Sequence, residues 1–184
     1  MTPRQAVRAT ATLVATLALA VVTGTATAAP AAADCPAGGC SSIALDLLES
    51  GRVTFDDYHQ SGVVDDATAL RNIHQTAAGL PARRSSYGTA PGGSVYLSKP
   101  MLQGLSYIAS AWRVRITEFA GGSHSATSYH YAGRALDIGS INGTLVSASN
   151  PHVSRVMQSC RASGANEVLG PGDAGHATHI HCAW

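Results

Sequence analysis

Two short stretches, far apart along the chain, constrain the fold more than any other feature of the sequence. The first runs from Ser128 to Asp137 (SYHYAGRALD), and the second runs from His176 to His181 (HATHIH). Together they supply imidazoles and one carboxylate, which are ligands that a tetrahedral zinc ion prefers. We therefore predict that the fold brings the two stretches together around one zinc ion, with a fourth position left open.

The start of the chain has the pattern of a secretory signal peptide. Arg4 and Arg8 precede an apolar run from Leu13 to Val22. Small residues at Ala26-Thr27-Ala28 offer a cleavage site, and Ala31-Ala32-Ala33 is a second option. This apolar run is too short to cross a bilayer, and no later run is long enough. We therefore expect residues 1–28 to be removed and the rest of the chain to be secreted, without a membrane span.

Cleavage after Ala28 leaves 156 of the 184 residues, enough for one domain with its own core. Ten basic and eleven acidic side chains remain, a formal charge of −1, and 12% of the whole sequence is charged. No basic run is present, so the composition does not favour nucleic acid or an anionic membrane as a partner. We expect a monomer.

Four cysteines are present, at Cys35, Cys40, Cys160 and Cys182. Disulfides are expected because an exported chain meets an oxidising environment. The simplest pairing joins Cys35 to Cys40 and Cys160 to Cys182, although four cysteines allow three pairings. Zinc binding by cysteine is the rival interpretation, and the lack of any C-x-x-C spacing argues against it.

Hydrophobic periodicity predicts an α+β fold in one compact domain, with a small, mostly antiparallel sheet flanked by helices. Residues 29–93 are expected to form a linker and short helices, and residues 94–184 the zinc-binding domain. Ser41 or Ser42 is expected to cap the first helix, and Asp65 or Asp66 the second. The expected helices lie near residues 43–48, 67–78, 99–112 and 151–164, and the expected strands near 95–97, 113–120, 135–138, 167–169 and 179–184. Loops are expected at 82–94 and 121–133, and a tight turn at 142–143.

The local patterns also place the candidate ligands. Gly133 and the apolar run after it indicate a loop leading into a strand, with His130 at the end of the loop and Asp137 on the strand. His179 and His181 are two residues apart, so a strand places both rings on one face and Ile180 in the core.

The first stretch matches the pattern S-x-H-x-x-G-x-A-x-D, and the late H-x-H follows it. This combination resembles the zinc peptidases grouped with D-alanyl-D-alanine carboxypeptidases, lysostaphin-type endopeptidases and hedgehog signalling domains. The ending H-x-x-H-x-H is similar to that of zinc D-Ala-D-Ala carboxypeptidases and penicillin-insensitive murein endopeptidases. The resemblance covers residues 95–184 and is carried by Ser128, His130, Gly133, Ala135, Asp137, His176, His179 and His181.

The resemblance implies that His130, Asp137 and His181 bind zinc, which would lower the pKa of a bound water to about 7 and polarise the scissile carbonyl. It implies that His179 contacts the attacking water or the developing oxyanion, and that His176 is a second such group on the substrate side. The alternative for His179 is a passive place in the pocket wall. The structural residues would be Ser128, which can hydrogen-bond the loop, and Gly133, which allows the backbone to turn.

Other polar residues have weaker support from the sequence. His124 is expected to face solvent rather than metal, and His59, His74 and His152 to lie on the surface. Three acids are candidate bases by residue type only, at Glu118, Glu167 and Asp173.

Three functions remain open. The first is a secreted zinc metallopeptidase that hydrolyses an amide in peptidoglycan peptides, as a carboxypeptidase or a murein endopeptidase. The second is a non-catalytic zinc-stabilised module that binds the cell wall or a partner. It is motivated by Thr178, which stands where relatives often have glutamate, and by the lack of the relatives' arginine in residues 116–122. The third is a secreted peptidase that acts on proteins or small peptides.

Overall fold

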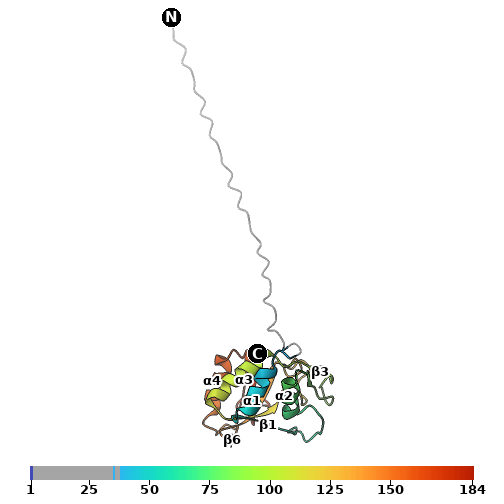
Figure 1. The fold of residues 1–184 in the computed structure, drawn as a ribbon. Helices are drawn as coiled ribbons and strands as arrows, with labels where there is room; N and C mark the ends of the chain where they lie inside the picture. The colour runs from blue at the N-terminus through green and yellow to red at the C-terminus, as the bar shows by residue number, and fades with distance from the viewer. Residues whose placement is uncertain (2–34, 36–37) are drawn as a thin grey trace.

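The computed structural model describes Met1, Cys35 and residues 38–184, and the predicted signal peptide and most of the predicted linker lie outside this part (Figure 1). The described residues form an α+β fold, as predicted. Its helices are α1 (Ser41–Glu49), α2 (Ala69–Ala77), α3 (Lys99–Ala111) and α4 (Val153–Ala162). Its strands are β1 (Val53–Phe55), β2 (Ala82–Arg83), β3 (Ser94–Val95), β4 (Val114–Glu118), β5 (Ala135–Ile141), β6 (Thr144–Leu145), β7 (Glu167–Leu169) and β8 (Ile180–Ala183).

The main sheet has six strands in the order β1-β4-β5-β8-β7, and β6 pairs with β5. It is mixed, because β1 runs parallel to β4 while the other strand pairs are antiparallel. Val53 lies opposite Val114 in the parallel pair. A strand from the segment before residue 94 therefore belongs to the same sheet as the strands that carry the two motif stretches.

The helices form a layer in which α3 lies between α1 and α4, and α2 packs beside α1 (Figure 1). Side chains from this layer and from one face of the sheet form a common core, because an apolar group removed from water contributes about 1.5–3 kcal/mol. Fully buried members of the core include Leu102, Leu105 and Ile108 of α3 and Ile116, Ile138 and Ile180 of the sheet. The opposite face of the central strands is left free to carry polar residues.

The sequence predicts the N-terminal cap of one helix correctly and those of two helices wrongly. Ser98 caps α3 as predicted, since its hydroxyl accepts a hydrogen bond from the backbone N–H of Met101. The predicted caps at Asp65 or Asp66 are wrong, because Thr68 accepts from the N–H of Arg71 at the start of α2. The predicted cap at Ser41 or Ser42 is also wrong, because α1 already begins at Ser41 and its preceding residue makes no side-chain cap.

Turns and short strands connect these elements. Asn142 and Gly143, with φ values of 50° and 81°, form the predicted tight turn between β5 and β6. The predicted loop over residues 82–94 is partly wrong, since Ala82–Arg83 and Ser94–Val95 pair as a short antiparallel ladder. Among the described residues, no helix has the length and apolar character needed to cross a bilayer.

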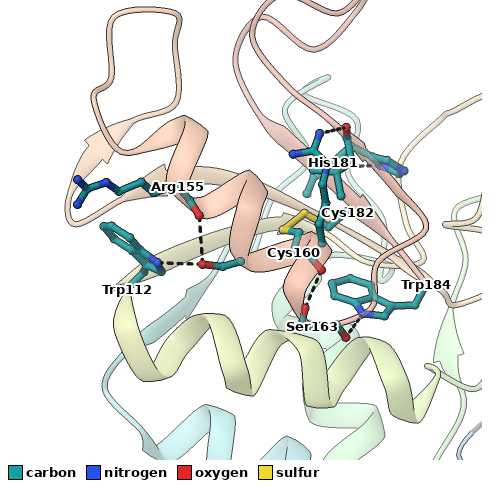
Figure 2. Close-up of a disulfide and its surroundings, with 11 residues drawn as sticks. Trp112, Arg155, Cys160, Ser163, His181, Cys182 and Trp184 are labelled. Atoms are coloured by element: carbon teal, nitrogen blue, oxygen red, sulfur yellow. Dashed lines mark hydrogen bonds and ion pairs between the residues drawn. A yellow bond between two sulfur atoms is a disulfide. The ribbon is translucent and has the colours of Figure 1, made fainter.

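Both predicted disulfides are present, Cys35–Cys40 and Cys160–Cys182. Figure 2 shows that the second joins α4 to β8, beside His181 on the same strand. The end of β8 is also fixed by Trp184, whose indole N–H donates to the carbonyl of Ser163 at 3.0 Å. Disulfides are typical of proteins in oxidising compartments.

Candidate metal centre

Three ligand-type atoms from the two motif stretches lie close together on the polar face of the sheet. The distance between His130 Nε2 and His181 Nδ1 is 3.1 Å, and Asp137 Oδ1 lies 3.3 Å from the first and 3.0 Å from the second. Ligand atoms around a tetrahedral zinc ion are about 3.3 Å apart, given metal–ligand distances of about 2.0–2.1 Å. The three atoms therefore have the spacing of three corners of a tetrahedral zinc site.

Sheet register places two of these side chains. Asp137 on β5 lies directly opposite His181 on β8 in an antiparallel pair, so both side chains leave the same face. Ile180 points into the core, fully buried, as the two-residue alternation predicts. The sheet alone therefore brings the late motif to the carboxylate of the first motif.

The turn before β5 places the third side chain. The hydroxyl of Ser128 accepts a hydrogen bond from the N–H of His130 at 3.3 Å, and the N–H of Gly133 donates to the carbonyl of His130. Gly133 has a φ of +66°, and a Cβ atom there would collide with the carbonyl oxygen of Tyr96. Ser128 and Gly133 thus have local roles in the turn that aims His130 at Asp137.

Hydrogen bonds on the far side of each ring fix which nitrogen is free. His130 Nδ1 donates to the carbonyl of Phe119, which leaves Nε2 as an acceptor facing Asp137. His181 Nε2 lies 3.3 Å from Glu167 Oε1, which leaves Nδ1 facing the same point. Metal-binding histidines commonly donate their other N–H to a carbonyl or carboxylate in this way. The donor set and its supporting contacts therefore fit a bound zinc ion.

Charge at the site agrees with this donor set. Burial acts to raise the pKa of Asp137, but the nearby His130 and His181 outweigh it and hold that pKa well below its usual range. Asp137 is therefore an anion at neutral pH. Burial acts to lower the pKa of His130, but Asp137 outweighs it and raises that pKa, so zinc binding would have to displace this proton. Two neutral imidazoles and one carboxylate would then leave the ion with a net charge of +1.

His124 lies nearer the site than the sequence predicts. The expectation that it faces solvent is wrong, because its ring stacks on that of His130 with centroids 3.9 Å apart and an angle of 9°. His124, His130 and Asp137 each offer a ligand atom within 4.8 Å of one another, so this group could also hold a metal ion. Burial, followed by the neighbouring His130, lowers the pKa of His124 to about 4. The triangle that includes His181 is tighter, with its three ligand atoms 3.0–3.3 Å apart.

The remaining predicted residues, His179 and His176, lie beside the triangle rather than in it. His179 Nε2 is 3.9 Å from Asp137 Oδ2, and burial lowers the pKa of this imidazole. The ring of His176 lies 4.9 Å from that of His179 and 5.8 Å from that of His181. The structure therefore brings every candidate site residue of the two motifs into one region.

The triangle lies in the wall of a cleft of about 970 Å³. The cleft is lined by the loop over residues 122–130, by the loop and strand over residues 175–181, by β4 and by residues 60–61. This volume is that of a site for a ligand of drug size or a short peptide. The segment before residue 94 thus contributes to the cleft as well as to the sheet.

One buried group in the cleft region was not predicted. His59 is only 2% exposed, whereas the sequence predicts a surface position. Its Nδ1 lies 2.7 Å from Glu118 Oε1, and its Nε2 lies 2.7 Å from Asp65 Oδ1. No short motif contains these three residues, because 59 positions separate His59 from Glu118. The only sequence signal was the acidic residue type of Glu118.

Comparison of the chain with protein-family models, with curated proteins and with solved structures found no match in any of the three. The chemistry of the cleft must therefore be argued from its own residues and from the motif pattern.

Proposed function

We propose that the protein is a secreted zinc metallopeptidase that hydrolyses an amide bond in peptidoglycan peptides. The observation that carries the proposal is the convergence of His130, Asp137 and His181 on one point in the wall of a peptide-sized cleft. A zinc ion bound there would lower the pKa of water to about 7 and polarise a carbonyl group. Three protein ligands with one open position are the usual arrangement of catalytic zinc.

The protein's own side chains have separate roles in this proposal. His130, Asp137 and His181 would hold the ion, and Glu167 would orient the ring of His181. His179 lies near the same carboxylate with a more exposed side chain, and its lowered pKa makes it neutral at pH 7. A neutral imidazole can donate a hydrogen bond to a developing oxyanion or accept a proton. His176 would extend this wall toward the substrate.

The substrate class is inferred from two properties. The first is the resemblance of the motif pair to enzymes that cut D-Ala-D-Ala dipeptides or murein cross-links. The second is the predicted signal peptide together with two disulfides, which fit a place outside the cytoplasm near the cell wall. A cleft of this volume, lined by several histidine, serine and threonine side chains, can hold an extended peptide.

The test uses folded protein with both disulfides intact, loaded with one equivalent of zinc. It is incubated with purified murein sacculi and with a panel of muropeptides, and newly released amines and product masses are measured. We expect zinc-dependent release, and no release after chelation or with Asp137→Asn. No cleavage of any substrate by the zinc-loaded protein would overturn the proposal. Murein binding without turnover would instead favour a non-catalytic module.

A further inference from the structure

The carboxyl group of Glu118 lies in the cleft because two shifts interrupt the register between β4 and β5. Ile116 pairs with Ile138 in the core, yet Glu118 pairs with Asp137, so Thr117 is an extra residue on β4. Regular alternation would place Glu118 on the buried face with Ile116. A bulge of this kind re-aims a side chain, and such bulges are frequent beside active sites.

The pairing also sets how far Glu118 lies from the candidate metal centre. Residues directly opposite each other on antiparallel strands have Cβ atoms about 4.5–5.5 Å apart and share a face. Glu118 therefore stands next to Asp137, and both line the same cleft.

One oxygen of this carboxylate is not used by the fold. Glu118 is 7% exposed, and its Oε2 is buried without a hydrogen-bond partner among the described residues. A buried hydrogen-bond acceptor without a partner costs about 1–3 kcal/mol of stability. Such groups are therefore rare in folded proteins, and each one calls for an explanation such as a catalytic role. The other carboxylates that line the cleft are committed, Asp137 to His130 and His181 and Glu167 to His181.

The other oxygen is held firmly. Glu118 Oε1 contacts His59 Nδ1 at 2.7 Å, and His59 Nε2 contacts Asp65 Oδ1 at 2.7 Å. Asp65 in turn accepts a hydrogen bond from the N–H of Ala67. This chain of contacts, from the segment before residue 94, fixes Oε1 and leaves Oε2 as the oxygen available to a ligand in the cleft.

We propose that Glu118 is the carboxylate that accepts the proton of the attacking water, and that His59 is the residue that positions it. The proposal rests on the proposed function and adds its proton acceptor. It leaves His179 to donate a hydrogen bond to the oxyanion.

The proton and electron pairs balance in two steps. A water O–H bond breaks, its proton moves to Glu118 Oε2, and the water oxygen bonds to the scissile carbonyl carbon while the C=O π pair moves onto the carbonyl oxygen. That pair then re-forms the C=O bond as the C–N bond breaks, and the nitrogen keeps the C–N electron pair and takes the proton from Glu118. One water is consumed, a carboxylic acid and an amine are formed, and Glu118 returns to its carboxylate form.

The decisive variant is Glu118→Gln, which keeps the shape and the contact with His59 but cannot accept a proton. We expect its kcat on a cleaved muropeptide to fall by about 10²- to 10⁴-fold, with KM, muropeptide Kd and zinc content unchanged. Glu118→Asp is a second variant. It keeps a carboxylate but moves it back on a shorter side chain, so we expect a smaller loss of kcat. Glu49→Gln, an exposed acid on α1, is the matched control and should retain full activity.

His59 needs a separate test, because a positioning role must differ from a purely structural one. His59→Ala should lower kcat by about tenfold or more with little change in KM, and His59→Gln, which can still donate to Glu118, should recover part of the loss. Thermal melting and zinc content show whether each variant is folded and loaded.

The outcomes separate the two proposals. An active wild type whose Glu118→Gln variant is folded, zinc-loaded and equally active would overturn the role of Glu118 and leave the proposed function standing. A raised muropeptide Kd with an unchanged kcat would show that Glu118 binds substrate instead. A zinc-loaded wild type without any turnover would overturn the proposed function, and the role of Glu118 with it.

Discussion

Asp137 on β5 and His181 on β8 are a cross-strand pair whose Oδ1 and Nδ1 atoms lie 3.0 Å apart. The pair joins the two motif stretches through sheet register, and the turn ending at Gly133 adds His130 to it. A shift of one residue between these strands would turn one of the two side chains into the core. The site therefore depends on correct pairing of the C-terminal strand.

The charge of Asp137 should be essential for metal binding. Asp137→Asn keeps the shape but removes the anion, so we expect zinc affinity to fall by at least about 100-fold, more than the loss typical of a supporting residue. Competition with a chelator of known affinity measures this. Asp46→Asn, an exposed change on α1, should leave the affinity unaltered. Equal zinc affinity of the Asp137 variant and the wild type would remove Asp137 from the ligand set.

His179 should affect rate and not metal content. It lies beside the triangle, with Nε2 3.9 Å from Asp137 Oδ2, so His179→Ala should lower kcat by about 100-fold while one zinc remains bound. Kinetics and elemental analysis on the same sample test this. His74→Ala, at an exposed position on α2, is the matched control. Loss of zinc together with rate would instead identify His179 as a ligand.

Gly133 should resist substitution more than another glycine of similar backbone conformation. Gly133→Ala combines a left-handed φ of +66° with a collision against Tyr96, so we expect the free energy of unfolding to fall by at least about 2 kcal/mol. Gly143→Ala has a φ of +81° but open space around its Cβ, and should cost about 1 kcal/mol. Urea unfolding of both variants measures the difference. Similar losses would show that the collision is relieved by movement.

Stability should fall as the solution becomes alkaline. The hydrogen bond that His59 donates to Glu118 acts against burial and, with Asp65, raises the pKa of His59 from 6.5 to about 9. The folded state then binds a proton more tightly than the unfolded state, so this stabilisation is complete below pH 6.5 and is lost as pH rises through about 9. Urea midpoints of the metal-free protein between pH 6 and 10 test the direction. His59→Gln should flatten that part of the profile, and an equal slope in this variant would assign the effect to another group.

The disulfide beside His181 should be the more stabilising of the two. Cys160–Cys182 closes a sequence separation of 22 residues, and loop-closure entropy gives about 3 kcal/mol for such a loop. Cys35–Cys40 closes a separation of 5, for which the same relation gives about 2 kcal/mol. Double alanine variants of each pair, compared by chemical unfolding, measure both. We also expect weaker zinc binding only when Cys160 and Cys182 are replaced, because β8 then loses its anchor to α4.

Local signals predicted the parts of the fold that depend on local physics. Ser98 followed by Pro100 marked the start of α3, and the alternation around Ile180 predicted that His179 and His181 share a face. The predicted cap of α2 at Asp65 is wrong because the carboxylate of Asp65 pairs with the buried ring of His59 instead. Residue type alone could not reveal which of two competing contacts an aspartate makes.

The Glu118 region could not be predicted for a different reason. The face of the sheet on which the Glu118 side chain lies depends on a register shift between β4 and β5. Neither strand's own sequence indicates that shift. Its partner His59 is contributed by a distant segment, and the stacking of His124 on His130 also depends on the folded loop. Such contacts arise from tertiary packing, which a single sequence without aligned relatives does not reveal.

The parallel pairing of β1 with β4 has a practical consequence for any shortened version of this protein. A chain beginning at Ser94 would keep every side chain of the triangle but would strip the outer neighbour from β4. The unpaired backbone N–H and C=O groups of β4 would then hydrogen-bond to strands of other molecules and favour insoluble aggregates. Recombinant expression of residues 94–184 alone is therefore expected to yield inclusion bodies, even though both motif stretches are intact.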